Sequence, residues 1–156
     1  MIKLICFFTT ALITTSLAAE ELATCRDPIG KAYFHFVGLI SKKDSGWSND
    51  GIRGGTFTLV QLPDSSFDLL YVDTRKKPIS SVQDGAVVRL LVQGTSTLTV
   101  LVYYKNVTTE IYTFFKNKEG QSQFTMLTSR SGDDVPISKS ALLTGPCDTI
   151  RFDLVK

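Results

Sequence analysis

The chain has 156 residues, of which 43% are hydrophobic and 21% are charged, and its formal net charge is +2. A charge this close to zero indicates neither nucleic acid nor an anionic membrane as a partner. The longest basic cluster, 75–77, lies between Asp73 and Pro78 and predicts an exposed turn. Nucleic-acid binding is therefore excluded, because a basic face with interleaved stacking aromatic residues is missing.

Residues 1–19 have the pattern of a secretory signal peptide. Lys3 precedes a run of apolar and small residues that ends at Ala19, before two glutamates. The run is too short and too rich in threonine to span a bilayer, which takes about 20 apolar residues. We therefore expect a secreted or periplasmic protein without a membrane span, with 20–156 as a single all-β domain.

The cysteines predict one disulfide. Cys6 leaves with the signal peptide, so that only Cys25 and Cys147 remain. Two cysteines in an exported protein are expected to pair, and this bridge would join the first segment of the domain to its last strand. The alternatives are two buried thiols or a zinc pair. Metal is the weaker of these, since His35 is the only histidine and no CxxC occurs, and we expect no metal and no cofactor.

Short β-branched and aromatic runs, separated by Gly, Pro, Asn and Asp, follow one another along the chain. The predicted strands are 33–40, 55–62, 67–73, 86–92, 98–104, 110–115, 123–128 and 149–155. Hairpins at this spacing favour an all-β antiparallel meander of about eight strands, closed or nearly closed into a small barrel, with a β-sandwich as the alternative. At most one short helix is expected, near 137–143, before a stop at Gly145 and Pro146.

The predicted strand 98–104 is apolar on both faces apart from Thr99. Such a strand needs cover on both sides, or it leaves an apolar patch exposed. A barrel of about eight strands holds either its own side chains or one small ligand. The sequence does not choose between these two.

No catalytic constellation is evident, so the sequence favours a binding protein over an enzyme. A serine or cysteine nucleophile needs a base, and His35 lies in a predicted strand where a packed role is the default. No Gly-x-Ser-x-Gly elbow occurs. Paired carboxylates remain open as the basis of a hydrolase, and the candidates are Asp50, Asp68, Asp73, Asp84, Asp133 and Asp134.

The segment 45–55, SGWSNDGIRGG, contains four glycines and the only tryptophan. Its spacing fits no phosphate-binding loop, and its composition predicts a turn. In one interpretation Trp47 plugs the end of the barrel. In the other, Trp47, Asp50 and Arg53 form a recognition site, with the tryptophan at its centre.

The sequence is compatible with three functions, in decreasing order of support: a binding module for a small apolar ligand or a protein, a structural or inhibitory interaction domain that acts through 45–55, and a hydrolase. An internal cavity lined by Phe57, Val100 or Phe152 would support the first, and an exposed Trp47 over a filled core the second. Asn106 begins an Asn-x-Thr sequon in a predicted hairpin turn, which is accessible to glycosylation if the source is eukaryotic.

Overall fold

The computed structural model describes residues 18–72 and 77–155, so the predicted signal peptide up to residue 17, and Asp73 with most of the basic cluster 75–77, lie outside the described part. The described elements are β1 (Glu20–Arg26), β2 (Ile29–Phe34), η1 (Lys42–Asp44), β3 (Gly46–Gly51), β4 (Thr56–Gln61), β5 (Phe67–Val72), β6 (Pro78–Ser80), β7 (Val87–Gln93), β8 (Thr97–Tyr104), β9 (Thr108–Lys116), β10 (Ser122–Arg130), β11 (Lys139–Ile150) and η2 (Phe152–Leu154).

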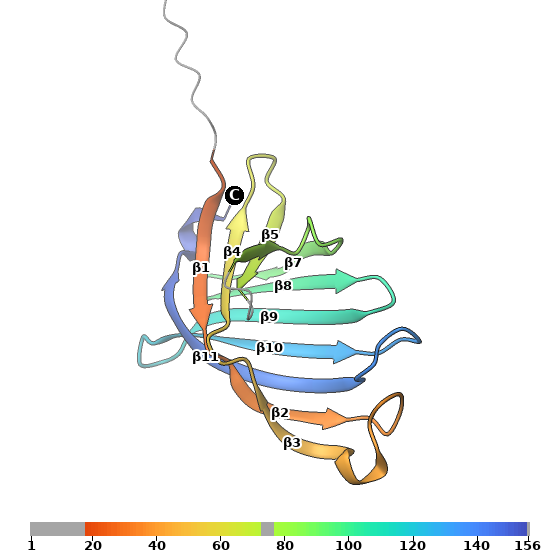
Figure 1. Ribbon diagram of the computed structural model, residues 1–156. Helices are drawn as coiled ribbons and strands as arrows, with labels where there is room; N and C mark the ends of the chain where they lie inside the picture. Colours follow the sequence, from red (N-terminus) through yellow and green to blue (C-terminus); the bar gives the residue numbers. More distant parts are fainter. Residues whose placement is uncertain (1–17, 73–76, 156) are drawn as a thin grey trace, which may run out of the picture.

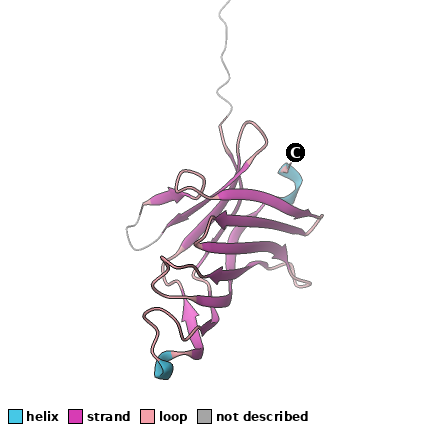
Figure 2. Cartoon of the chain, turned by 90° about the vertical axis from the view of Figure 1, so that its right-hand side faces the viewer, coloured by secondary structure: helices cyan, strands magenta, loops and turns pink. Residues whose placement is uncertain are grey.

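All eleven described strands belong to one antiparallel sheet, which is curled into a half-barrel (Figures 1 and 2). The strand order is β6-β5-β4-β1-β11-β10-β9-β8-β7. The curl brings β5, near one end of this order, into contact with β7 at the other end. The prediction of an all-β antiparallel fold built from hairpins is confirmed.

The long strand β11 connects the two parts of the sheet. Its first half pairs with β2 on one side and β10 on the other, and its second half pairs with β1. Gly145 lies where the partner changes. A Cβ there would collide with the carbonyl of Arg26 and lie 2.8 Å from the Phe124 ring, so only glycine permits this close approach.

Four local expectations differ from the structure. The predicted strand 33–40 overlaps β2 only at Tyr33 and Phe34, and the chain leaves the sheet after Phe34. Residues 139–143 belong to β11 and not to a helix, because pairing with β2 and β10 overrides the weak local preference. The predicted strand 149–155 ends at Ile150 and continues into η2. The segment 45–55 holds β3, which pairs with β2 along its whole length, and this hairpin contributes to a strand count of eleven where about eight were expected.

The core fills one end of the half-barrel. Phe57 of β4 lies 5.8 Å from Tyr112 of β9 and 5.7 Å from Phe124 of β10, measured between ring centroids. Phe114 stacks on Phe124 at 6.1 Å. Together with the buried Leu98 and Val100 of β8, these rings link the two sides of the curled sheet.

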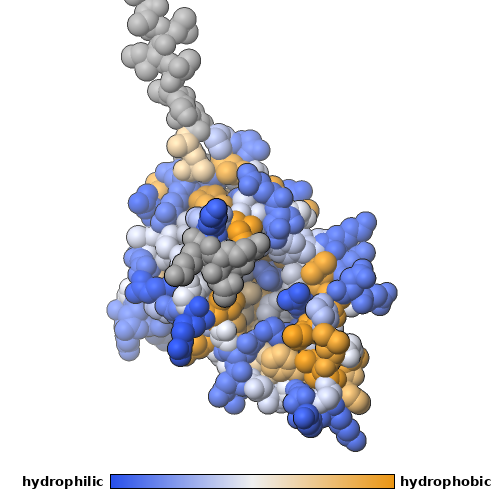
Figure 3. Space-filling model, viewed as in Figure 1, coloured by the Kyte–Doolittle hydropathy of each residue, from blue (hydrophilic) through white to orange (hydrophobic). Residues whose placement is uncertain are grey.

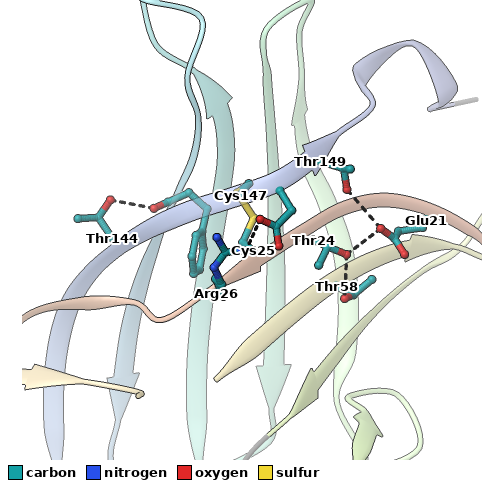
Figure 4. The surroundings of a disulfide bond; sticks show 10 residues. Glu21, Thr24, Cys25, Arg26, Thr58, Thr144, Cys147 and Thr149 are labelled. Atoms are coloured by element: carbon teal, nitrogen blue, oxygen red, sulfur yellow. Dashed lines mark hydrogen bonds and ion pairs between the residues drawn. A yellow bond between two sulfur atoms is a disulfide. The ribbon is translucent and has the colours of Figure 1, made fainter. Parts of the chain in front are cut away.

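The predicted disulfide is present between Cys25 of β1 and Cys147 of β11, which are direct cross-strand partners with Cα atoms 3.8 Å apart (Figure 4). Around it, the Glu21 carboxylate accepts hydrogen bonds from Thr24 at 2.8 Å and Thr149 at 3.3 Å. The bridge therefore closes almost the whole described domain. No helix in residues 18–72 or 77–155 is long and apolar enough to cross a membrane.

Candidate functional site

An open cavity of about 420 Å³ lies on the concave side of the half-barrel. It faces the end of the sheet where β8 turns into β9 and β10 connects to β11, at the right in Figure 1. The inward residues change along each strand: β9 runs from Phe114 and Tyr112 to Glu110, and β10 from Phe124 and Met126 to Thr128. Because the smaller or more polar residues gather at this end, the same strands that build the core leave it open.

Three tyrosines and three carboxylates line this cavity, and we name five of these residues the tyrosine–carboxylate cluster: Tyr71, Asp84, Tyr104, Glu110 and Tyr112. Tyr71 Oη donates to Asp84 Oδ2 at 2.9 Å, and Tyr112 Oη donates to Glu110 Oε2 at 2.7 Å. Tyr104 lines the same cavity as Asp84 and Glu110, and the charge of each carboxylate contributes to raising the pKa of Tyr104.

Burial shifts the pKa of four members of the cluster. It raises the pKa of the Glu110 carboxyl above its ordinary value, against the opposing effects of the Tyr112 hydrogen bond and the Arg130 charge. It also raises the pKa of Tyr71, Tyr104 and Tyr112, with neighbouring carboxylates acting in the same direction. The tyrosines are therefore neutral hydrogen-bonding groups, and Glu110 is a carboxylate held partly out of water.

Two cations complete the rim of the cavity. Lys139 forms an ion pair with Asp50 and also lies 5.6 Å from the centroid of the Phe34 ring. Arg130 stands exposed at the end of β10. The lining thus holds three acidic residues, Asp50, Asp84 and Glu110, and two basic ones, which is a formal net charge of −1.

The structure separates the three residues of the predicted recognition site. Trp47 pairs with Tyr33 on the convex face, with ring centroids 5.5 Å apart, and 71% of its surface is exposed. Asp50 lines the cavity on the concave side, and Arg53 is exposed in the turn before β4. Strand alternation explains this division: Trp47 and Asp50 are three positions apart on β3 and so face opposite ways.

The candidate carboxylates of a hydrolase also divide. Asp50 and Asp84 line the cavity, whereas Asp68 is buried and accepts hydrogen bonds from Ser80 Oγ and from the Val82 backbone N–H, which organises the turn after β6. Asp73 lies outside the described residues, and Asp133 and Asp134 are exposed in a turn. His35 is half-buried, and its Nε2 lies 3.5 Å from Ser140 Oγ.

The sequon residue Asn106 is exposed in the tight turn between β8 and β9, with φ at 60°. Thr108 follows as the first residue of β9. The predicted hairpin position of the sequon is therefore correct.

The convex face carries an exposed apolar patch, which is one of the two arrangements expected from the apolar pattern of 98–104. Outward residues of four neighbouring strands are direct cross-strand partners in one row, namely Leu142, Leu127, Ile111 and Leu101. A shallow hollow of about 340 Å³ lies beside this row, bordered by Trp47 and Leu142.

Sequence reasoning missed the centre of the cavity. Glu110, Tyr112 and Phe114 alternate along β9, and this period places a carboxylate on the same face as two core aromatic rings. That pattern was a readable signal of a buried acidic group. The contributions of Arg130 and Lys139 carried no such signal, since the pairing of β9 with β10 and of β10 with β11 brings them near Glu110. Tyr71 carried none either, because only the curl of the sheet brings β5 to this cavity.

No protein-family model, no curated protein and no solved structure matches the chain.

Proposed function

We propose that this chain is a secreted or periplasmic binding module that holds a small, mainly apolar molecule in the concave cavity. The observation that carries the proposal is the cavity of about 420 Å³ with the Glu110–Tyr112 pair in its wall. Binding sites for small molecules are typically concave and mostly apolar, with a few placed polar groups. The disulfide fits an oxidising compartment.

The lining indicates the chemistry of the ligand. Phe57, Met126 and Leu143 offer an apolar wall, and Glu110 offers a carboxylate that has lost part of its water. A partly desolvated carboxylate favours a ligand that donates a hydrogen bond to it. The net charge of the lining also disfavours an anion. We therefore propose an apolar molecule that bears an amine or a hydroxyl group.

Of the three residues expected to line an internal cavity, Phe57 does so. Val100 is fully buried in the filled core, and Phe152 packs against that core from η2. The interaction domain acting through 45–55 has less support, because Trp47 and Asp50 point to opposite faces of β3. A hydrolase has less support still, because Asp50 is paired with Lys139 and Asp84 accepts a hydrogen bond from Tyr71.

A titration with aminoanthracene, an apolar aromatic amine that fluoresces more strongly out of water, tests the proposal. We expect saturable one-to-one binding that is roughly tenfold weaker in Glu110→Gln, since a hydrogen bond to a charged acceptor is lost. Anilinonaphthalene sulfonate, an anionic apolar dye, should bind the cavity more weakly.

Two neighbouring substitutions on β10 locate the bound probe. Thr128→Trp places a large ring at the cavity wall and should abolish binding, whereas Leu127→Trp adds the same ring on the exposed convex face and should leave it unchanged. Loss of binding in Leu127→Trp with retention in Thr128→Trp would move the site to the convex face and overturn the proposal. No saturable binding by the wild-type protein would do the same.

A further inference from the structure

The connection between β2 and β3 exposes an unusual set of apolar side chains. Leu39 is 78% exposed, Trp47 71% and Phe36 62%, and Val37 and Tyr33 are also exposed. We name these five residues the apolar tip. In Figures 1 and 2 the end of this hairpin forms an extremity of the molecule, and in Figure 3 apolar residues gather in this region. Contiguous exposed apolar surface of this kind marks an interaction site.

The tip is held in place by backbone hydrogen bonds. The N–H of Leu39 donates to the Pro136 carbonyl at 3.1 Å, and the N–H of His35 donates to the Ser138 carbonyl at 3.0 Å. Gly38 adopts φ of +60°, and a Cβ there would lie 3.0 Å from the Pro136 carbonyl oxygen. This turn holds the neighbouring apolar residues at the surface, so that the tip is ordered before it meets a partner.

The segment that carries the tip is basic. From residue 31 to residue 47 the chain contains Lys31, Lys42 and Lys43 and a single acidic residue, Asp44, for a formal net charge of +2 with histidine neutral. The Asp44 carboxylate accepts a hydrogen bond from Ser41 at 2.6 Å. On the convex face of β2 and β3, both fully described, the register leaves Lys31 as the only charged residue. The turn that packs against Gly38 follows Asp133 and Asp134, so the excess of positive charge belongs to the β2–β3 segment itself.

We propose that the apolar tip docks onto an anionic lipid surface. A protruding apolar loop with tryptophan and tyrosine beside it fits the interface of a bilayer, where apolar groups enter about 5–10 Å and amphipathic rings lie at headgroup level. Lysines next to such a loop meet anionic headgroups. The tip itself projects from the sheet, which suits a continuous surface better than a partner that must offer a fitted pocket.

Sedimentation with phospholipid vesicles tests the proposal. The protein, purified after export from a secreting host, is mixed with vesicles of phosphatidylcholine alone or with added phosphatidylserine. We expect binding to the phosphatidylserine vesicles, weakened by salt, and a blue shift of Trp47 emission on binding, because Trp47 is the only tryptophan.

Matched variants assign any binding to the tip. Phe36→Ser with Leu39→Ser should weaken binding by roughly tenfold or more, since most of the inserted apolar area is removed. Leu91→Ser with Val92→Ser removes two similarly exposed apolar residues of β7 and should leave binding unchanged. Lys42→Glu with Lys43→Glu should abolish the preference for phosphatidylserine. Far-ultraviolet circular dichroism checks the fold, and Leu39→Ser alone replaces the double variant if that fails to fold.

Three results would overturn the proposal. The first is no binding to phosphatidylserine vesicles. The second is equal binding to both kinds of vesicle, which would remove the role of the lysines. The third is a Phe36→Ser, Leu39→Ser variant that binds as the wild type does. The wild-type protein could instead bind no vesicles but form a complex with another protein. If the Phe36→Ser, Leu39→Ser variant then loses that complex, the tip is a protein-binding site and not a lipid-binding one.

Discussion

The two ends of the half-barrel are built from the same strands and yet differ in content. On β10, Phe124 lies in the core, Met126 belongs to both the core and the cavity wall, and Thr128 continues that wall. On β9 the same change runs from Phe114 in the core through Tyr112, which belongs to both, to Glu110 in the cavity wall. One continuous strand thus stabilises the core at one end and lines an open site at the other. The two-residue period of the strand decides which side chains point inward, and the size of those side chains decides whether the space inside the half-barrel is filled.

The filled end should depend most strongly on the disulfide. The bridge joins residues 122 positions apart, so replacing both cysteines by serine should lower the free energy of unfolding by about 4–5 kcal/mol in the chain-entropy model. Urea unfolding of the double variant, compared with wild type under oxidising conditions, measures the loss. A decrease below about 1 kcal/mol would show that β1 and β11 are held together without the bridge.

Paired substitutions on β10 compare the two ends directly. Phe124→Ala should destabilise the fold by about 3–5 kcal/mol, because a fully buried ring that contacts Phe57 and Phe114 is removed. Thr128→Ala should cost about 1 kcal/mol or less, since it loses a hydroxyl contact with Thr108 at the edge of the cavity. Similar losses in both variants would contradict the division into a filled and an open end.

The open end should have its own pH dependence through Glu110. Its pKa is raised in the native state, so between the ordinary value of 4.5 and the raised value the native protein binds more protons than the unfolded chain. The contribution of Glu110 to stability therefore falls as pH rises through this window. Glu110→Gln should remove that fall, which urea unfolding at a series of pH values measures. If the free energy of unfolding has the same pH dependence in Glu110→Gln as in the wild type, the Glu110 carboxyl is hydrated and its pKa is not raised.

The smallest effect on stability is expected at Trp47, which lies outside both ends. Trp47→Ala should change the free energy of unfolding by about 0.5 kcal/mol or less, because the side chain is mostly exposed and contacts chiefly Tyr33. In the wild-type protein its emission should be red-shifted and quenched by iodide. Blue, shielded emission together with unfolding of the variant would restore the interpretation of Trp47 as a barrel plug.

Local sequence patterns determined several features of this protein. Alternating β-branched and aromatic runs predicted an all-β fold, and six of the eight predicted runs coincide largely with described strands. The other two, 33–40 and 149–155, share only two residues each with β2 and β11. The count of two cysteines outside the predicted signal peptide predicted the Cys25–Cys147 bridge. These features are readable because turn chemistry, side-chain period and cysteine number are local or countable properties.

Tertiary structure alone decided the rest. Residues 139–143 became part of β11 because two neighbouring strands offered hydrogen-bonding partners on both sides. Trp47 and Asp50 came to lie on opposite faces because β2 pairs with β3, which the glycine-rich composition of the segment concealed. Tyr71 and Asp84 lie in the same cavity as Glu110 only because the sheet curls until β5 meets β7. Long-range pairing and curvature are set by the whole set of strands, and no single stretch of sequence carries them.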